Sequence, residues 1–197
     1  MRKLRRLAPV ALALPVLAAG CLSQVLPEPA PPPVTFDFGP PPDTPSAALP
    51  APFRLDAVTA PSWLRSPNIY YRRLDEQRTA LVPYAQNVWI ASAAELFAER
   101  LASRLARAGA EQASEPLALE LELESFEHVY TAPDRAYVVA RLRAAYRGRD
   151  GQTRERVLEV RRPAAATVDG ATAELPRAAD DLLDAVLEWL REAVPAP

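Results

Sequence analysis

The sequence contains few of the residues on which most catalytic and metal sites depend. Its 197 residues include one cysteine, Cys21, and one histidine, His128. A single cysteine excludes an intrachain disulfide and a cysteine-cluster metal site, and a single histidine excludes a multi-histidine zinc site. The phosphate-binding, dinucleotide-binding and serine-hydrolase patterns GxxxxGK[ST], GxGxxG and GxSxG are also missing. We therefore expect a protein that is not an enzyme and that holds no cofactor and no metal.

An excess of basic charge is missing as well. The chain has 23 basic and 25 acidic residues, and four of the basic ones lie within the first six positions. Without residues 1–20 the remaining chain is clearly acidic. Proteins that bind nucleic acids need a basic surface to displace counterions from the phosphates. We therefore expect no nucleic-acid partner.

The first 20 residues are typical of a signal peptide. A basic start, Met1 to Arg6, precedes an apolar stretch, Leu7 to Ala19, that is too short and too rich in proline to span a bilayer. The sequence LAAGC at residues 17–21 resembles a bacterial lipobox, although the leucine stands one position earlier than usual. This resemblance predicts that Cys21 is the lipidation site, carrying palmitate-type acyl chains. The alternative is an ordinary signal peptide whose cleavage leaves a chance cysteine.

Leu22 follows the cysteine, where lipoproteins retained in the inner membrane tend to have aspartate. The resemblance therefore implies a protein anchored by lipid to the outer membrane of a Gram-negative bacterium, on its periplasmic face. Residues 21–52 are predicted to form the acylated N-terminus and a proline-rich tether, because proline removes a hydrogen-bond donor and disfavours helices. Within the tether, residues 34–38 alternate apolar and polar side chains. They could form a short strand, or the whole tether could be disordered.

Residues 53–197 are predicted to form one α+β domain, a mixed, largely antiparallel sheet with two amphipathic helices packed on one face. A capping box, Ser92 with Glu95, opens the first helix, which we expect over residues 91–108. The second is expected from about Pro176 to Val194. The expected strands cover residues 53–58, 68–72, 81–84, 117–124, 136–147 and 153–161.

The strongest alternation, LALELELE at residues 117–124, places the four leucines on one face and the glutamates at 120, 122 and 124 on the other. A hairpin closing at Thr131-Ala132 would set Glu122 opposite Arg141 and Glu120 opposite Arg143. We interpret this as a solvated face held by salt bridges, since arginines keep neighbouring glutamates ionised. Glu127 and His128 could be half of a catalytic or metal pair, but a surface histidine at the start of a loop is the favoured interpretation.

Aromatic and arginine side chains gather in residues 63–89, a composition that is enriched at protein interfaces. Trp63, Tyr70 and Arg72 are the predicted partner-binding residues. The alternative is that Trp89 and some of the tyrosines of this window fill the core beside the first helix.

The order of these features resembles the ABC-type transport auxiliary lipoproteins, a family that includes the paraquat-inducible intermembrane transport lipoprotein. The resemblance rests on FRLDAVTAPSWLRSPNIYYR, on Tyr84 and Trp89 before the first helix, and on LELELESFE. It departs from the family at Arg65-Ser66, where aspartate or asparagine is usual, and in the proline-rich tether.

The resemblance implies a non-catalytic, periplasmic component of an intermembrane lipid or solvent transport system. Its partners would be an ABC permease and ATPase and a mammalian-cell-entry (MCE) type substrate-binding protein, with the membrane reached through the lipid on Cys21. A lipoprotein that activates or assembles a cell-wall synthesis machine is the alternative. A homo-oligomeric ring is compatible with these features but is not required by them.

Overall fold

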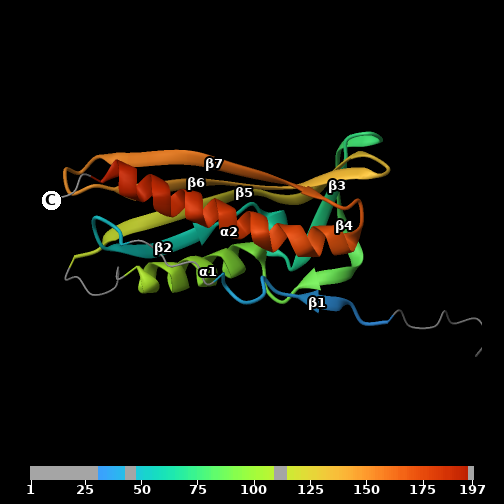
Figure 1. The fold of residues 1–197 in the computed structure, drawn as a ribbon, viewed down its shortest axis with the longest axis horizontal. Helices are drawn as coiled ribbons and strands as arrows, with labels where there is room; N and C mark the ends of the chain where they lie inside the picture. Colours follow the sequence, from blue (N-terminus) through green and yellow to red (C-terminus); the bar gives the residue numbers. More distant parts are fainter. Residues whose placement is uncertain (1–30, 43–47, 109–114, 195–197) are drawn as a thin grey trace, which may run out of the picture. The chain divides into compact units, whose positions relative to one another are not determined.

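We analysed a computed structural model that describes residues 31–42, 48–108 and 115–194. From Pro33 on, the described residues form one compact unit with a seven-stranded mixed sheet and two α-helices, which confirms the α+β class. Among the described residues no helix is both long and apolar enough to cross a membrane. The elements are β1 (Val34–Phe36), β2 (Phe53–Thr59), the 3-10 helix η1 (Ser62–Arg65), β3 (Asn68–Arg73), β4 (Gln77–Trp89), α1 (Ala93–Arg107), β5 (Leu117–Ala132), β6 (Arg135–Arg147), β7 (Thr153–Ala164) and α2 (Val168–Ala193) (Figure 1).

The long strand β5 organises the sheet. The strand order is β1-β4-β3-β5-β6-β7, and β2 also pairs with β5. One edge of β5 pairs antiparallel with β6 along its whole length. The other edge pairs in parallel with β2 over its first half and with β3 over its second half. Three strand pairs are antiparallel: β3 with β4, β5 with β6, and β6 with β7. They include the longest strands, as predicted.

The β5–β6 hairpin is shifted by two residues from the predicted register. Glu122 lies opposite Arg143, and Arg141 lies opposite Ser125, so the predicted pairs Glu122–Arg141 and Glu120–Arg143 are wrong. The turn falls after Ala132 rather than at Thr131-Ala132, and a β-bulge between Leu123 and Ser125 inserts one further residue. Because a two-residue shift keeps every side chain on its own face, the predicted polar and apolar faces are nevertheless correct.

The first helix begins as predicted. The Ser92 hydroxyl accepts a hydrogen bond from the Glu95 amide at 3.3 Å, and the Glu95 carboxylate accepts one from the Ser92 amide at 2.9 Å. The second helix begins at Val168, with Thr167 as its cap, and not at Pro176. Pro176 lies inside it and costs one helical hydrogen bond. Burial of the apolar side chains in the first two turns, Ala171 and Leu175 among them, offsets that cost.

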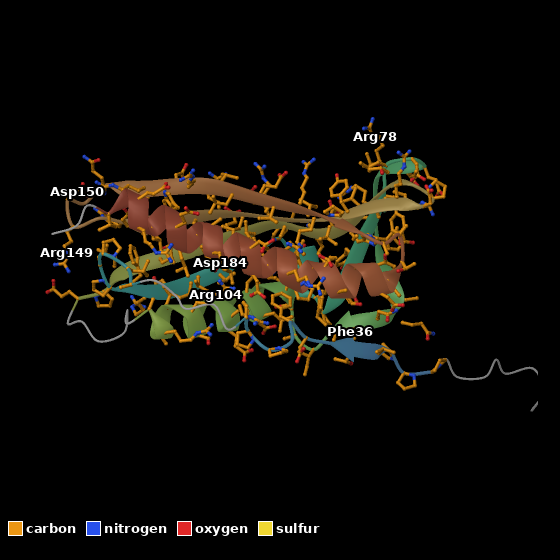
Figure 2. All side chains as sticks on the ribbon, in the orientation of Figure 1. Phe36, Arg78, Arg104, Arg149, Asp150 and Asp184 are labelled. Carbon is orange, nitrogen blue, oxygen red and sulfur yellow. The ribbon has the colours of Figure 1, made fainter. Side chains whose placement is uncertain are left out.

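Both helices cover the apolar face of the sheet, as predicted. Arg104 of α1, only 3% exposed, donates to Asp180 of α2 at 2.8 Å and also pairs with Asp184. Figure 2 shows Arg104 and Asp184 pointing toward one another between the two helices. This contact fixes the two helices side by side on the sheet.

The packed unit begins earlier than Phe53, where the sequence analysis places the start of the domain. The short strand in residues 34–38 is present: β1 pairs in parallel with the end of β4. Phe38 then enters the core, where it packs edge-on against Trp89 and Phe97, both at a centroid distance of 5.5 Å. Arg100 donates to the carbonyls of Phe38 and Gly39, at 2.7 Å each. The segment predicted as tether is therefore partly a structural element.

Candidate partner-binding surface

The face of the sheet opposite the helices carries a lattice of ion pairs, which we call the polar face. Arg141 of β6 bridges Glu124 of β5, at 2.7 Å, and Glu159 of β7, at 3.0 Å. Arg143 approaches three carboxylates within 3.6 Å: Glu122, Glu124 and Glu155. The hydrogen bond from Arg141 lowers the pKa of Glu159. The prediction of a face held by salt bridges is confirmed.

The predicted partner-binding residues Trp63 and Tyr70 lie together beside this face. Their rings meet edge to face with centroids 5.2 Å apart. The Tyr70 hydroxyl lies 3.1 Å from the Ser66 hydroxyl and accepts a hydrogen bond from the Asn68 side chain at 3.2 Å. Both rings are half-buried, and Trp63 also contacts the core. One side of each ring therefore packs inward while the other side remains accessible.

Arg72 lies two residues beyond Tyr70 on the same strand and so on the same face. Its guanidinium forms a two-point ion pair with Glu127 of β5, at 3.2 and 3.1 Å. It also donates to the Arg78 carbonyl at 3.1 Å. Such paired, planar contacts hold an arginine in one orientation. The three predicted residues are thus neighbours along one border of the polar face, whereas their role toward a partner stays a prediction.

Cys21, the predicted lipidation site, lies outside the described residues, as do residues 1–20. Within the described ranges no group of three or more histidine, cysteine or acidic side chains is placed to hold a metal ion. On the polar face, Arg141 and Arg143 are instead the partners of four carboxylates, those of Glu122, Glu124, Glu155 and Glu159.

The prediction of a surface histidine is wrong, because His128 is fully buried. Strand β5 continues through Ala132, so His128 lies within the sheet, opposite the core residue Val138. Glu127 faces the other side of the sheet, since neighbouring residues of a strand alternate. Glu127 and His128 therefore cannot act as a pair on one substrate or metal.

His128 belongs to a buried network with two tyrosines. The Tyr84 hydroxyl lies 2.7 Å from His128 Nδ1 and 2.9 Å from the Tyr130 hydroxyl, and the Tyr71 ring packs on Tyr84. Burial raises the pKa of Tyr84 and lowers the pKa of His128 to about 4. The histidine is therefore neutral at pH 7. Sequence analysis did not find this network, although its tyrosines lie in or near the aromatic window.

We expect His128 to make stability depend on pH. The unfolded chain takes up a proton at the ordinary histidine pKa of 6.5, whereas the folded chain does so only near 4. Between these values the unfolded state holds more protons, so stability falls as the pH falls. The His128 contribution to this loss is about 3 kcal/mol. The free energy of unfolding in urea, measured for the wild type and for His128→Gln at pH 7, 6, 5 and 4, checks this contribution.

Glutamine can still hydrogen-bond to Tyr84 but does not titrate. We expect the His128→Gln protein to lose less stability than the wild type between pH 7 and 4. Parallel curves for the two proteins would contradict the assignment, because the remaining carboxylates titrate equally in both.

Comparisons with solved structures identify proteins with the same fold. A crystal structure of a Xanthomonas campestris protein of the DUF330 family matches with a TM-score of 0.63 at 18% identity, over 81% of this chain and 91% of that one. A protein described only as uncharacterized matches with a TM-score of 0.59 at 12% identity, over 81% and 99%. No protein-family model and no curated protein matches the sequence. At these identities the two structures establish a shared fold.

Proposed function

We propose that this chain is a lipid-anchored, non-catalytic component of an ABC and MCE type intermembrane transport system. In this proposal Cys21 anchors the chain to the outer membrane, and the domain acts in the periplasm. The domain carries no motif for ATP hydrolysis. The energy for transport would therefore come from a partner ATPase and permease, and the cargo would pass through an MCE-type substrate-binding protein.

One observation carries the proposal. The segments in which the sequence resembles the transport auxiliary lipoproteins fall on β2 with η1 and β3, on the end of β4, and on β5. β2, η1, β3 and β4 follow one another in the sequence, whereas β5 comes only after α1; in the sheet the strands are neighbours, in the order β4-β3-β5 with β2 also beside β5. Motifs that come together in one region of a fold are expected when they serve one structural and functional unit.

The polar face supports a docking role. Its arginines are held by two or more contacts each, so a partner meets side chains with fixed positions and little conformational entropy to lose. The accessible sides of Trp63 and Tyr70 add aromatic area at its border, and aromatic and arginine side chains dominate the binding energy of protein interfaces. We propose that a transporter subunit docks here.

Affinity purification tests the proposal. The tagged wild-type chain and a Cys21→Ser variant are purified from cells after separation of membrane and soluble fractions, with mass spectrometry of the N-terminal peptide and of bound proteins. We expect an acylated Cys21 in the wild type and a shift of Cys21→Ser from the membrane to the soluble fraction. Because several acyl chains on one residue give lasting membrane attachment, loss of the acylation site should move most of the Cys21→Ser protein to the soluble fraction.

The bound proteins separate the candidate functions. An ABC permease with an MCE-type protein is the expected result for the wild type. Cell-wall synthases without any transporter subunit would overturn the transport role while leaving the anchor in place. The predicted anchor would be overturned if Cys21 of the wild-type protein is unmodified and the protein is found in the soluble fraction.

A further inference from the structure

A groove of about 520 Å³ lies between one edge of the sheet and the first half of α2. One wall is the chain from Thr35 to Pro40, joined by Ile90. The other wall is one face of α2, where the lining residues recur at helical spacing: Thr172, Ala173, Pro176, Arg177 and Asp180. Figure 1 shows β1 near the N-terminal end of α2, and Figure 2 labels Phe36 on this strand. The groove therefore has an edge strand on one side and a helix on the other.

The edge strand offers main-chain groups that have no hydrogen-bond partner among the described residues. β1 is the terminal strand of the sheet on this side. The Phe36 carbonyl accepts a hydrogen bond from the Ile90 amide at 2.7 Å, so the main-chain groups of Phe36 face β4. In a strand the neighbouring residues face the other way, and the amide and carbonyl groups of Thr35 and Asp37 therefore point to the free edge. Such an edge can pair with another extended chain.

The helix wall adds an acceptor. In an α-helix the amide of residue 176 would bond to the carbonyl of residue 172. Pro176 has no amide hydrogen, so the Thr172 carbonyl receives no bond from it. Both residues line the groove. On the helix wall the Thr172 carbonyl therefore lacks its usual partner four residues later.

The side chains at this edge indicate what would fill it. Val34 is 56% exposed and Ile90 is 66% exposed, and these are the two most exposed of the large apolar side chains in the described part of the chain. Among the charged groups of the groove, Asp180 is paired with Arg104 and Arg177 with Glu174. Asp37 is exposed and forms no ion pair with any described residue, although its Oδ1 accepts a hydrogen bond from the Gly39 amide at 2.7 Å. An occupant with apolar side chains and one basic residue would complement these groups.

We infer that this groove binds an extended segment of a partner protein, which adds to β1 as a further strand of the sheet. Main-chain hydrogen bonds to Thr35 and Asp37 would provide affinity, and alternate side chains would provide specificity. The segment has apolar residues at alternating positions, beside Val34 and Phe36, which share one face of β1, and a lysine or arginine opposite Asp37. This inference rests on the groove alone and does not depend on the proposed transport role.

Peptide selection tests the inference. Random peptides of about ten residues, displayed on phage, are selected on the protein purified from membranes, and enriched sequences are synthesised for binding measurements. We expect alternating apolar residues with one basic residue. Thr35 is in register with Val88, but its amide points to the free edge and away from β4. Thr35→Pro removes this amide and should weaken binding at least about tenfold. The matched control Thr35→Val keeps the amide and should bind like the wild type.

A methylation scan of the best peptide distinguishes strand addition from other modes of binding. Methylating one backbone nitrogen at a time should weaken binding at alternate positions only, because alternate amides face β1. Asp37→Lys, an exposed substitution, serves as a second variant if Thr35→Pro lowers the unfolding midpoint, and it should also weaken binding.

Other results would overturn the inference. These are a selection that yields no peptide, peptides that bind Thr35→Pro and Asp37→Lys as tightly as the wild type, and a methylation scan without alternation. Self-association of the wild type that Thr35→Pro abolishes would assign the groove to a second copy of the chain instead. None of these measurements involves transport. A result that overturns the peptide-binding groove would therefore leave the proposed transport function untouched.

Discussion

Phe126→Ala is expected to lower the free energy of unfolding by about 3 to 5 kcal/mol. Phe126 is 2% exposed and contacts three other aromatic rings, those of Phe38, Trp89 and Phe97, at centroid distances of 5.3 to 5.9 Å. These rings come from the segment after β1, from β4 and from α1. Truncation would leave a cavity at the point where three elements meet, and chemical denaturation followed by tryptophan fluorescence measures the loss.

Val82→Ala provides the control for Phe126→Ala. Val82 also lies in a strand of the sheet but is 37% exposed, so its truncation should change stability by about 0.5 kcal/mol or less. A Phe126→Ala protein as stable as Val82→Ala would show that the aromatic cluster is not the centre of the core.

Arg104→Met has the second large expected effect, a loss of about 2 to 4 kcal/mol. Removing one partner of a buried ion pair leaves the other charge uncompensated, at a cost of roughly 3 to 5 kcal/mol. The expectation is set lower here because Asp184 is half exposed and because Arg100 remains near Asp180, with its Nε at 3.8 Å from the carboxylate. Methionine preserves most of the side-chain volume, so the charge is the main change. Equilibrium unfolding in urea measures the difference.

Arg107→Met is the matched control, since Arg107 lies on the same helix but is exposed, and among the described residues its side chain hydrogen-bonds only to the Ser103 carbonyl one turn earlier. It should unfold within about 0.5 kcal/mol of the wild type. If Arg104→Met behaves like Arg107→Met, the two helices are held together by their apolar contacts and not by the buried pair.

Sequence patterns predicted the fold well wherever one periodicity ran unbroken. The alternation in residues 117–124 and the capping box at Ser92 identified β5 and α1 with their correct faces. The prediction failed where the pattern was interrupted. A β-bulge after Leu123 moves the inward positions from odd to even residue numbers, so Phe126 and His128 face the core although the preceding leucines are odd-numbered.

Some parts of the candidate site can be predicted from the sequence and others cannot. The charged face follows directly from alternation. The buried network of Tyr84, His128 and Tyr130 joins residues of β4 and β5, which are separated by β3 in the sheet, and no local pattern predicts such a contact. The sequence analysis places the start of the second helix at about Pro176, and proline is favoured in the first turn of a helix. Tertiary packing of the preceding turns overrode this preference.

The pairing of β2 and β3 with the same edge of β5 also has a consequence for how the chain reaches this structure. Phe53 pairs with Leu117 and Tyr70 with Glu127, so both early strands find their parallel partner only after the whole of α1 has intervened. Contacts between residues so distant in sequence require the closure of long loops. This entropic cost lowers the folding rate. The first half of the chain therefore remains without its central strand until β5 is available, and collapse around β5 is the step at which the sheet becomes continuous.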